Sequence, residues 1–365
     1  MGFVDSEVTK NFFVDSVPAK NRGRCFSVNE MFGTRAKAFI GDSKIHDANF
    51  AFLSTSLAKL HKKLYEPKVY FTYQKDIDIN PGGGFVDFVT YYTVNWAGIM
   101  NEMRNVVGNN ANFIPRVNAS LTQKNVNVYT YEVAYDLRFI ELEKMKKIDL
   151  QKSIEEIYRN AILAGWDFFV QKVAYLGLNG GTGLFNDANV KVTTIDNNEA
   201  TGKGFEGLSD DAFVGFINGI FETYLDQSNM NITLFPNRIL VPTFVQSDAV
   251  SRYSQLYTNT LLDFIKEHNL GKAQSGAEDF KLVIEARPDL NTAGVGGHGR
   301  IVAYRKDEDF VRIDMPYPMQ HYITLPNIDK MSYTSAFVGQ VSQVQLPYNT
   351  SNTELGVVSY WDFTK

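Results

Sequence analysis

Residues 149–177, with the sequence DLQKSIEEIYRNAILAGWDFFVQKVAYLG, carry the clearest secondary-structure signal in the chain. Apolar side chains recur there at three- and four-residue steps, at Leu150, Ile154, Ile157, Ala161, Ala164 and Phe168. This is the periodicity of an amphipathic α-helix. Asp149 is the expected N-cap, Gly177 the expected end, and Glu155 with Arg159 a supporting pair on the polar side. At 1.5 Å per residue the helix would be about 40 Å long, so we expect it to form the spine of the fold.

On the N-terminal side of this helix, the pattern predicts an arm, a helix and a long hairpin. Residues 1–45 lack a regular pattern, and residues 46–64 place apolar side chains on one helical stripe. The segments 85–94 and 125–133 are rich in β-branched and aromatic residues, as strands are. The polar insert that joins them is too long for a tight turn, so we expect the two strands to form an extended projecting hairpin.

The sequence that follows this helix predicts a mixture of helices and strands. Ser209 is expected to cap a second helix, and residues 259–269 to form another that stops near Gly271. Alternating apolar residues predict strands at 280–286 and 310–315. The last 35 residues are also β-like.

The bulk composition excludes several classes of protein. The 365-residue chain is 44% hydrophobic and 21% charged, which argues against global disorder. Its net charge is −5, so the chain lacks the excess of basic residues that sequence-specific nucleic-acid-binding proteins carry. No segment approaches the roughly 18 to 20 apolar residues that a membrane-spanning helix needs. The single cysteine, Cys25, cannot form an internal disulfide and fits a reducing compartment.

The glycines in GVGGHGR, residues 294–300, have the G-x-G-x-x-G spacing of a dinucleotide-binding loop. Such a loop needs a helix directly after it, whereas RIVAY, residues 300–304, is strand-like. We therefore expect a mobile hairpin tip. No other segment matches a catalytic or metal-binding motif, so we predict no catalytic residue, cofactor or metal.

One acidic segment matches a calcium-binding loop in part. Asp76, Asp78, Asn80 and Asp87 have a suitable alternation, but Pro81 stands where such a loop needs glycine. A half-buried strand explains the alternation better.

The order of these elements resembles that of tailed-bacteriophage major capsid proteins of the Hong Kong 97-like fold. The similarity covers most of the chain from about residue 46. It includes YYTVNWAG and NVYTYEVAYDLRFIELE in the hairpin, YLGLNGGTGLFND after the long helix, and VIEARPDLNTAGVGGHGRIVAYRKDEDFVRIDMPYPMQ at 283–320. The last segment is the most specific.

The resemblance implies an α+β capsid fold with five parts. These are an N-terminal arm (1–70), an extended E-loop hairpin with its flanking strands (71–136), a peripheral domain with the spine helix (137–208), an axial domain (209–330), and C-terminal strands returning to the peripheral domain (331–365). Gly294, Gly296, Gly297 and Gly299 would then form an axial-domain loop tip. Arg104, Arg116 and Lys124 of the E-loop would contact neighbouring subunits, for example at acidic patches such as Asp307, Glu308 and Asp309.

The implied function is a structural shell protein, not an enzyme, that assembles through pentamers and hexamers into an icosahedral capsid around phage DNA. The implied partners are other copies of the chain, a separate scaffolding protein, a portal, possible decoration proteins and DNA in non-specific contact. Assembly would take place in the bacterial cytoplasm. Three alternatives remain open: an encapsulin-type compartment, another structural component such as a tail protein, and an enzyme that binds a nucleotide at residues 294–299.

Overall fold

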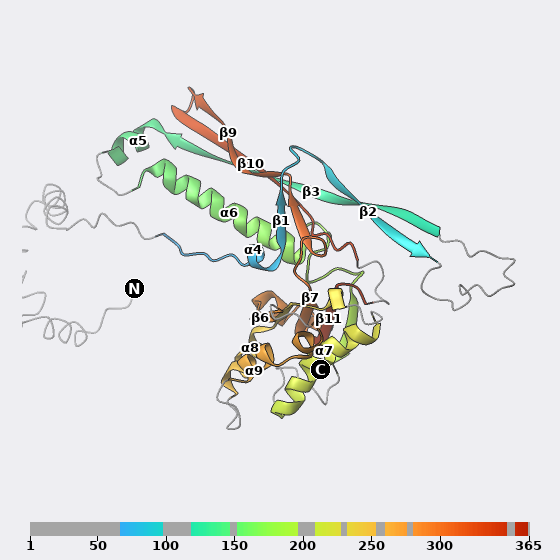
Figure 1. The fold of residues 1–365 in the computed structure, drawn as a ribbon. Helices are drawn as coiled ribbons and strands as arrows, with labels where there is room; N and C mark the ends of the chain where they lie inside the picture. The colour runs from blue at the N-terminus through green and yellow to red at the C-terminus, as the bar shows by residue number, and fades with distance from the viewer. Residues whose placement is uncertain are drawn as a thin grey trace, which may run out of the picture. The chain divides into compact units, whose positions relative to one another are not determined.

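The computed structural model describes residues 66–97, 118–146, 152–195, 209–227, 232–252, 260–275, 280–348 and 355–363. Residues 66–365 form one compact unit (Figure 1). The arm and the helix expected at 46–64 lie outside the described residues.

The α-helices of the described residues are α4 (Tyr73–Asp76), α5 (Phe139–Lys146), α6 (Ile154–Leu176), α7 (Asp210–Gln227), α8 (Thr243–Ser251), α9 (Leu261–Glu267) and α10 (Leu270–Ser275). The strands are β1 (Asp78–Pro81), β2 (Phe88–Ala97), β3 (Asn118–Arg138), β4 (Lys191–Ile195), β5 (Arg238–Val241), β6 (Val283–Ala286), β7 (Arg300–Tyr304), β8 (Arg312–Met315), β9 (Tyr317–Asn327), β10 (Ser332–Ser342) and β11 (Val358–Phe363).

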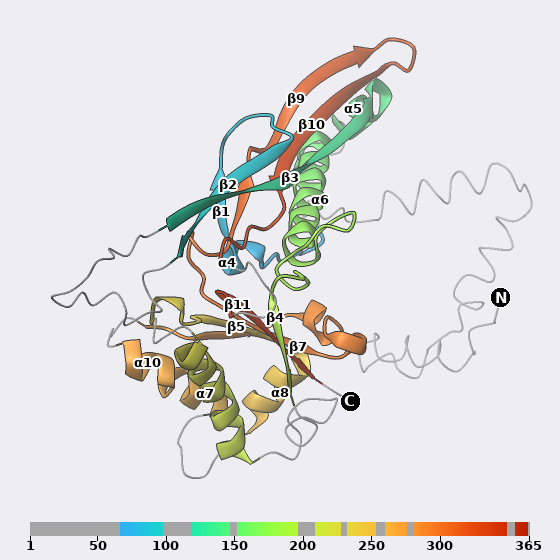
Figure 2. The same cartoon turned by 90° about the vertical axis from the view of Figure 1, so that its right-hand side faces the viewer.

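A five-stranded sheet with the order β4-β11-β7-β5-β6 stands between two hydrophobic cores. Side chains alternate across a strand, so neighbours along β7 enter different cores. Val302 and Tyr304 pack in the core that contains α6, whereas Ile301 and Ala303 pack in the core that contains α7. Figure 2 shows the sheet between these two sets of helices. Both faces are therefore covered, which explains why all five residues of β7 are buried.

A second sheet has the order β2-β3-β10-β9. Its longest strand, β3, changes partner part-way: residues 118–127 pair with β2, and residues 128–138 pair with β10. In the first half of β3, β2 is thus the neighbouring strand on one side and no described strand lies on the other. This half forms a two-stranded ribbon, which we call the β2–β3 ribbon (Figure 1).

Helix α6 agrees with the predicted spine helix except at its start. Gly177 ends it, with φ 72°, and the backbone N–H of Gly177 donates to the carbonyl of Val173 at 3.1 Å. The cap at the other end is Ser153, whose hydroxyl accepts from the N–H of Glu156 at 3.2 Å. Asp149 was therefore the wrong cap. Aspartate and serine are similarly favoured as N-cap residues, so residue preference alone could not choose between Asp149 and Ser153.

Ser209 caps α7 as predicted, since its hydroxyl accepts from the N–H of Ala212 at 3.3 Å. Two local predictions were wrong. The strand predicted for the acidic segment forms at β1, but Asp76 belongs to α4 and not to the strand. Gly271 lies inside α10 instead of ending a helix, and a Cβ at this position would lie 2.6 Å from the Phe221 ring.

The five-part division into arm, E-loop, peripheral, axial and C-terminal parts stays a prediction. The last strand, β11, pairs with β4 and with β7, whereas β10 pairs with β3 and β9. The C-terminal segment thus contributes β10 to the four-stranded sheet and β11 to the five-stranded sheet, whereas the two-stranded sheet consists of β1 and β8.

Candidate functional site

The glycine loop at 294–299 is not a hairpin tip. The strand before it, β6, and the strand after it, β7, both pair with β5 and so are not neighbours. Two short 3-10 turns connect them, Pro288–Asn291 and Val295–Gly297. The hairpin prediction was wrong because local alternation does not reveal that a third strand lies between the two.

This loop is fixed by contacts with the last strand. The N–H of Val295 donates to the Asp362 carboxylate at 3.0 Å, and Arg300 donates to both oxygens of the same carboxylate at 2.6 and 2.8 Å. A Cβ on Gly299 would lie 2.7 Å from the Phe244 ring. Gly294 and Gly299 therefore serve close packing, whereas Gly296 and Gly297 have positive φ angles, 72° and 78°, which favour glycine. No helix follows the loop to receive a pyrophosphate, so the geometry does not favour a nucleotide site.

Asp76, in the acidic segment that partly matches a calcium-binding loop, is fully buried and accepts hydrogen bonds from cationic side chains. Arg238 donates to it at 2.8 Å, and Arg287 donates with two nitrogens at 2.7 Å each. The hydroxyl of Tyr175 donates as well. Two guanidinium groups occupy the place a cation would need, and the described residues contain no group of three or more metal-binding side chains. Among the described residues, no helix is long and apolar enough to span a membrane.

The β2–β3 ribbon has one covered face and one exposed face. Tyr91 lies opposite Lys124 on the covered face, together with Val126, which is buried. Burial and the nearby charge of Asp187 raise the pKa of Tyr91. The alternate residues form the other face, where Phe88, Tyr92, Val94 and Leu121 are exposed. We call these four residues the ribbon apolar face.

The ribbon apolar face is a strong candidate for an interaction surface. Leu121 is 67% exposed and Tyr92 is 61% exposed. Soluble monomers rarely display contiguous large apolar side chains on a projecting element, and such patches usually mark protein contacts. The described part of this chain supplies nothing that covers them.

Of the three basic residues predicted for E-loop contacts, the structure describes one. Arg104 and Arg116 lie outside the described residues. Lys124 lies on β3 and is half-buried on the covered face beside Tyr91, away from the ribbon apolar face. The sequence pattern identified the ribbon but could not say which alternate face would be covered.

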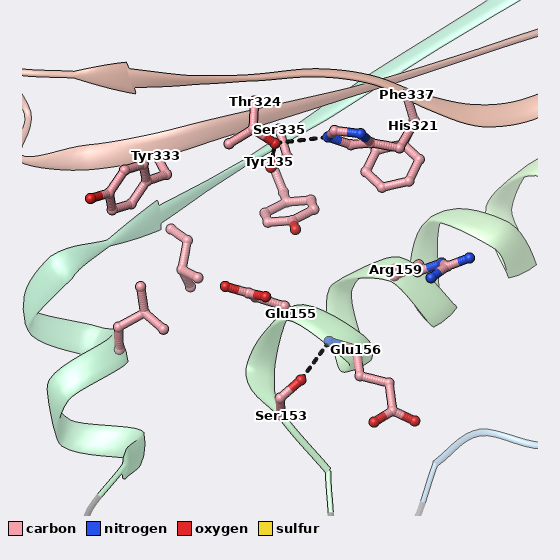
Figure 3. Close-up of a pocket in the computed structure, with 12 residues that line it drawn as sticks. Tyr135, Ser153, Glu155, Glu156, Arg159, His321, Thr324, Tyr333, Ser335 and Phe337 are labelled. Carbon is pink, nitrogen blue, oxygen red and sulfur yellow. Dashed lines mark hydrogen bonds between the residues drawn. The ribbon is translucent and has the colours of Figure 1, made fainter.

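A groove lies near the far end of β3, between the second sheet and the helices α5 and α6 (Figure 3). Its volume is about 720 Å³. Tyr135, Tyr333 and Phe337 line the sheet side, and Ser153, Glu155 and Glu156 line the α6 side. Nothing in the sequence pattern pointed to it, because its walls come from segments nearly 200 positions apart.

Comparison with known proteins places this architecture in a family. A family model described as "Major capsid protein" matches residues 104–352, which is more than half of the chain.

The chain belongs to the major capsid protein family.

Solved capsid structures share the fold of this capsid protein. The capsid of Myoviridae phage XM1 superposes with a TM-score of 0.63 at 17% identity, covering 85% of this chain and 98% of that one. A structure from Microbacterium phage Oxtober96 gives 0.53 at 13% identity, covering 86% and 98%. The capsid of the native GTA particle gives 0.54 at 8% identity, also covering 86% and 98%. No curated protein matches the chain.

The predicted tailed-phage capsid fold of the Hong Kong 97 type is therefore confirmed. The protein is a structural shell component of a virion capsid, and capsid proteins of this family self-assemble instead of catalysing a reaction.

Proposed function

We propose that this capsid protein assembles through pentamers and hexamers into an icosahedral shell that encloses phage DNA. The ribbon apolar face carries the proposal. Its four apolar side chains are exposed in the subunit, and a neighbouring copy in a shell would remove them from water. Many such modest contacts in a closed symmetric assembly act together.

We infer the other partners from the proposed role as a shell protein. A separate scaffolding protein would guide curvature, a portal would occupy one vertex, and decoration proteins could bind outside. Contact with DNA would be non-specific, in keeping with the net charge of −5. Assembly would take place in the bacterial cytoplasm before the particle leaves the cell.

The test is negative-stain electron microscopy of the purified protein, with light-scattering mass on the same fractions. We expect closed shells, or rings of five and six copies. A monodisperse monomer at every concentration tested, also after co-expression with candidate scaffolding proteins, would contradict the proposal.

A further inference from the structure

The buried ion cluster around Asp76 has more cationic than anionic groups in the interior. Asp76 is fully buried and accepts hydrogen bonds from both Arg238 and Arg287. The side chains of these two arginines are themselves only 14% and 7% exposed. Two guanidinium groups thus face one carboxylate away from water, where an uncompensated charge is costly.

Glu285 supplies the second negative charge. Its carboxylate lies 2.6 Å from Nη2 of Arg287, the same nitrogen that donates to Asp76. Unlike Asp76, the Glu285 side chain is 34% exposed. The neutrality of the buried cluster therefore depends on one carboxylate that protons from solvent can reach.

The charged groups that face Glu285 are all cations. They are Arg287 directly after β6, Arg238 of β5 and Lys75 of α4, which is exposed. Partial burial opposes ionisation of Glu285, but these three cations outweigh it and lower the pKa of the carboxyl below its ordinary value of 4.5. Because folding lowers this pKa, the charge of Glu285 stabilises the subunit fully above the ordinary value, and this contribution is lost as the pH falls below it.

The cluster joins α4 to the five-stranded sheet. Asp76 ends α4, whereas Arg238 lies in β5 and Glu285 in β6. Helix α4 has only four residues and no side-chain cap, and a helix this short is not stable by itself in water. Its order therefore depends on contacts such as those of Asp76. Lys306 adds an exposed contact, because its Nζ donates to the carbonyl of Lys75 at 3.0 Å.

We propose that Glu285 is an acid-sensitive latch, whose protonation loosens α4 from the five-stranded sheet while the sheet stays folded. The added proton neutralises the Glu285 carboxylate and leaves the two guanidinium groups with Asp76 alone. A buried cluster with a net charge gains more from contact with water than a neutral one, so opening at α4 becomes easier. Glu285 acts on Asp76 through Arg287 and is a positioning residue.

The experiment measures hydrogen exchange of the full chain by mass spectrometry from about pH 7 to about pH 4, corrected for the intrinsic effect of pH on exchange. Light scattering verifies that the protein stays in one assembly state. The reporters are backbone N–H groups in and around α4 that donate within the subunit: those of Thr72, Lys75, Asp76 and Ile77. The N–H groups of β7, whose five residues are all buried, are the reference.

Glu285→Gln is the test variant and Glu66→Gln the matched control. Glu66 lies 2.8 Å from Lys152, and the hydrogen bond from Lys152 lowers the pKa of Glu66 as well. This pair lies at the surface, so its loss uncovers no buried charge. The two substitutions therefore remove the same kind of charge, with and without the cluster behind it.

In the wild type, protection of the reporters should fall about fivefold relative to β7 as the pH drops to about 4. A hydrogen bond to a charged group is worth a factor of ten or more, and the partial exposure of Glu285 reduces it. Glu285→Gln should show the lower protection already at neutral pH, with no further fall in acid. Glu66→Gln should match the wild type.

Three results would overturn the latch. They are wild-type protection of the reporters in Glu285→Gln at neutral pH, an unchanged acid response in that variant, and an equal acid-induced loss of protection in β7. The last would mean that acid unfolds the subunit as a whole. None of these readings depends on shell assembly, so the latch and the proposed shell are tested separately.

Discussion

Arg287 donates from Nε and Nη2 to both carboxylate oxygens of Asp76, at 2.7 Å each, with Asp76 fully buried. The pair joins the end of α4 to the residue that follows β6. Arg238 of β5 adds a third charged hydrogen bond at 2.8 Å. The segment that leads into the ribbon is therefore fixed to the central sheet by buried charges.

Replacing Asp76 by asparagine should destabilise the subunit strongly. The change removes the acidic partner of Arg238 and leaves Arg287 with Glu285 alone, at 2.6 Å. Breaking a buried ion pair from one side costs about 3–5 kcal/mol. Urea unfolding of unassembled subunits measures it. Asp78→Asn is the control, because Asp78 is partly exposed and pairs with Lys306 at 3.2 Å, so its loss should cost under about 1 kcal/mol. Equal effects of the two substitutions would refute the role assigned to Asp76.

Two glycines inside α7 should be replaceable with a gain in stability. A Cβ on Gly215 or Gly219 would meet no atom within 4 Å. Alanine in a helix interior is more stable than glycine by about 0.5–1 kcal/mol, so each substitution should raise the free energy of unfolding by that amount. Gly271→Ala is the contrasting variant. Its Cβ would lie 2.6 Å from the Phe221 ring and 2.9 Å from the Phe280 ring, so it should destabilise.

Stability should fall steeply above about pH 10. Burial raises the pKa of Tyr73, Tyr175, Tyr224 and Tyr360 well above the ordinary tyrosine value. The neutral forms are stabilised in the fold, so their contribution is complete below the unfolded pKa. It is lost as the pH rises beyond that value, when only the unfolded chain releases these protons. Each such tyrosine adds up to about 1.4 kcal/mol per pH unit to the slope.

Urea unfolding between pH 8 and pH 11, with tyrosine ionisation followed by absorbance, checks this slope. Tyr224→Phe and Tyr360→Phe should each flatten it. A flat free energy of unfolding across the range would show that these hydroxyls ionise in the folded subunit.

The ribbon apolar face should matter for assembly and little for the subunit. Tyr92→Thr with Leu121→Thr changes exposed residues, so the free energy of unfolding should move by under about 1 kcal/mol. Shell yield, measured by sedimentation, should drop sharply. Val126→Thr on the covered face should instead lower subunit stability by about 1–3 kcal/mol, because it buries a hydroxyl. A double variant that assembles normally would contradict the assigned role.

The sequence predicted those elements that depend on residues close together in the chain. The spine helix, its end at Gly177 and the cap at Ser209 follow from side-chain spacing and from the backbone freedom of glycine. The paired strands of the ribbon follow from dense β-branched and aromatic residues.

Long-range pairing could not be predicted in this way. The sheet order places β11 between β4 and β7, and no local pattern contains that information. For the same reason the buried partners of Asp76 and the groove at Glu155 were missed: each joins segments that are distant in sequence. The resemblance to a known fold supplied the architecture but not these contacts.

Electron cryomicroscopy of assembled particles tests the central claim most directly. The account predicts that the β2–β3 ribbon of each copy lies against a neighbouring copy, with Phe88, Tyr92, Val94 and Leu121 withdrawn from solvent. A particle in which these four side chains face solvent in every copy would contradict it.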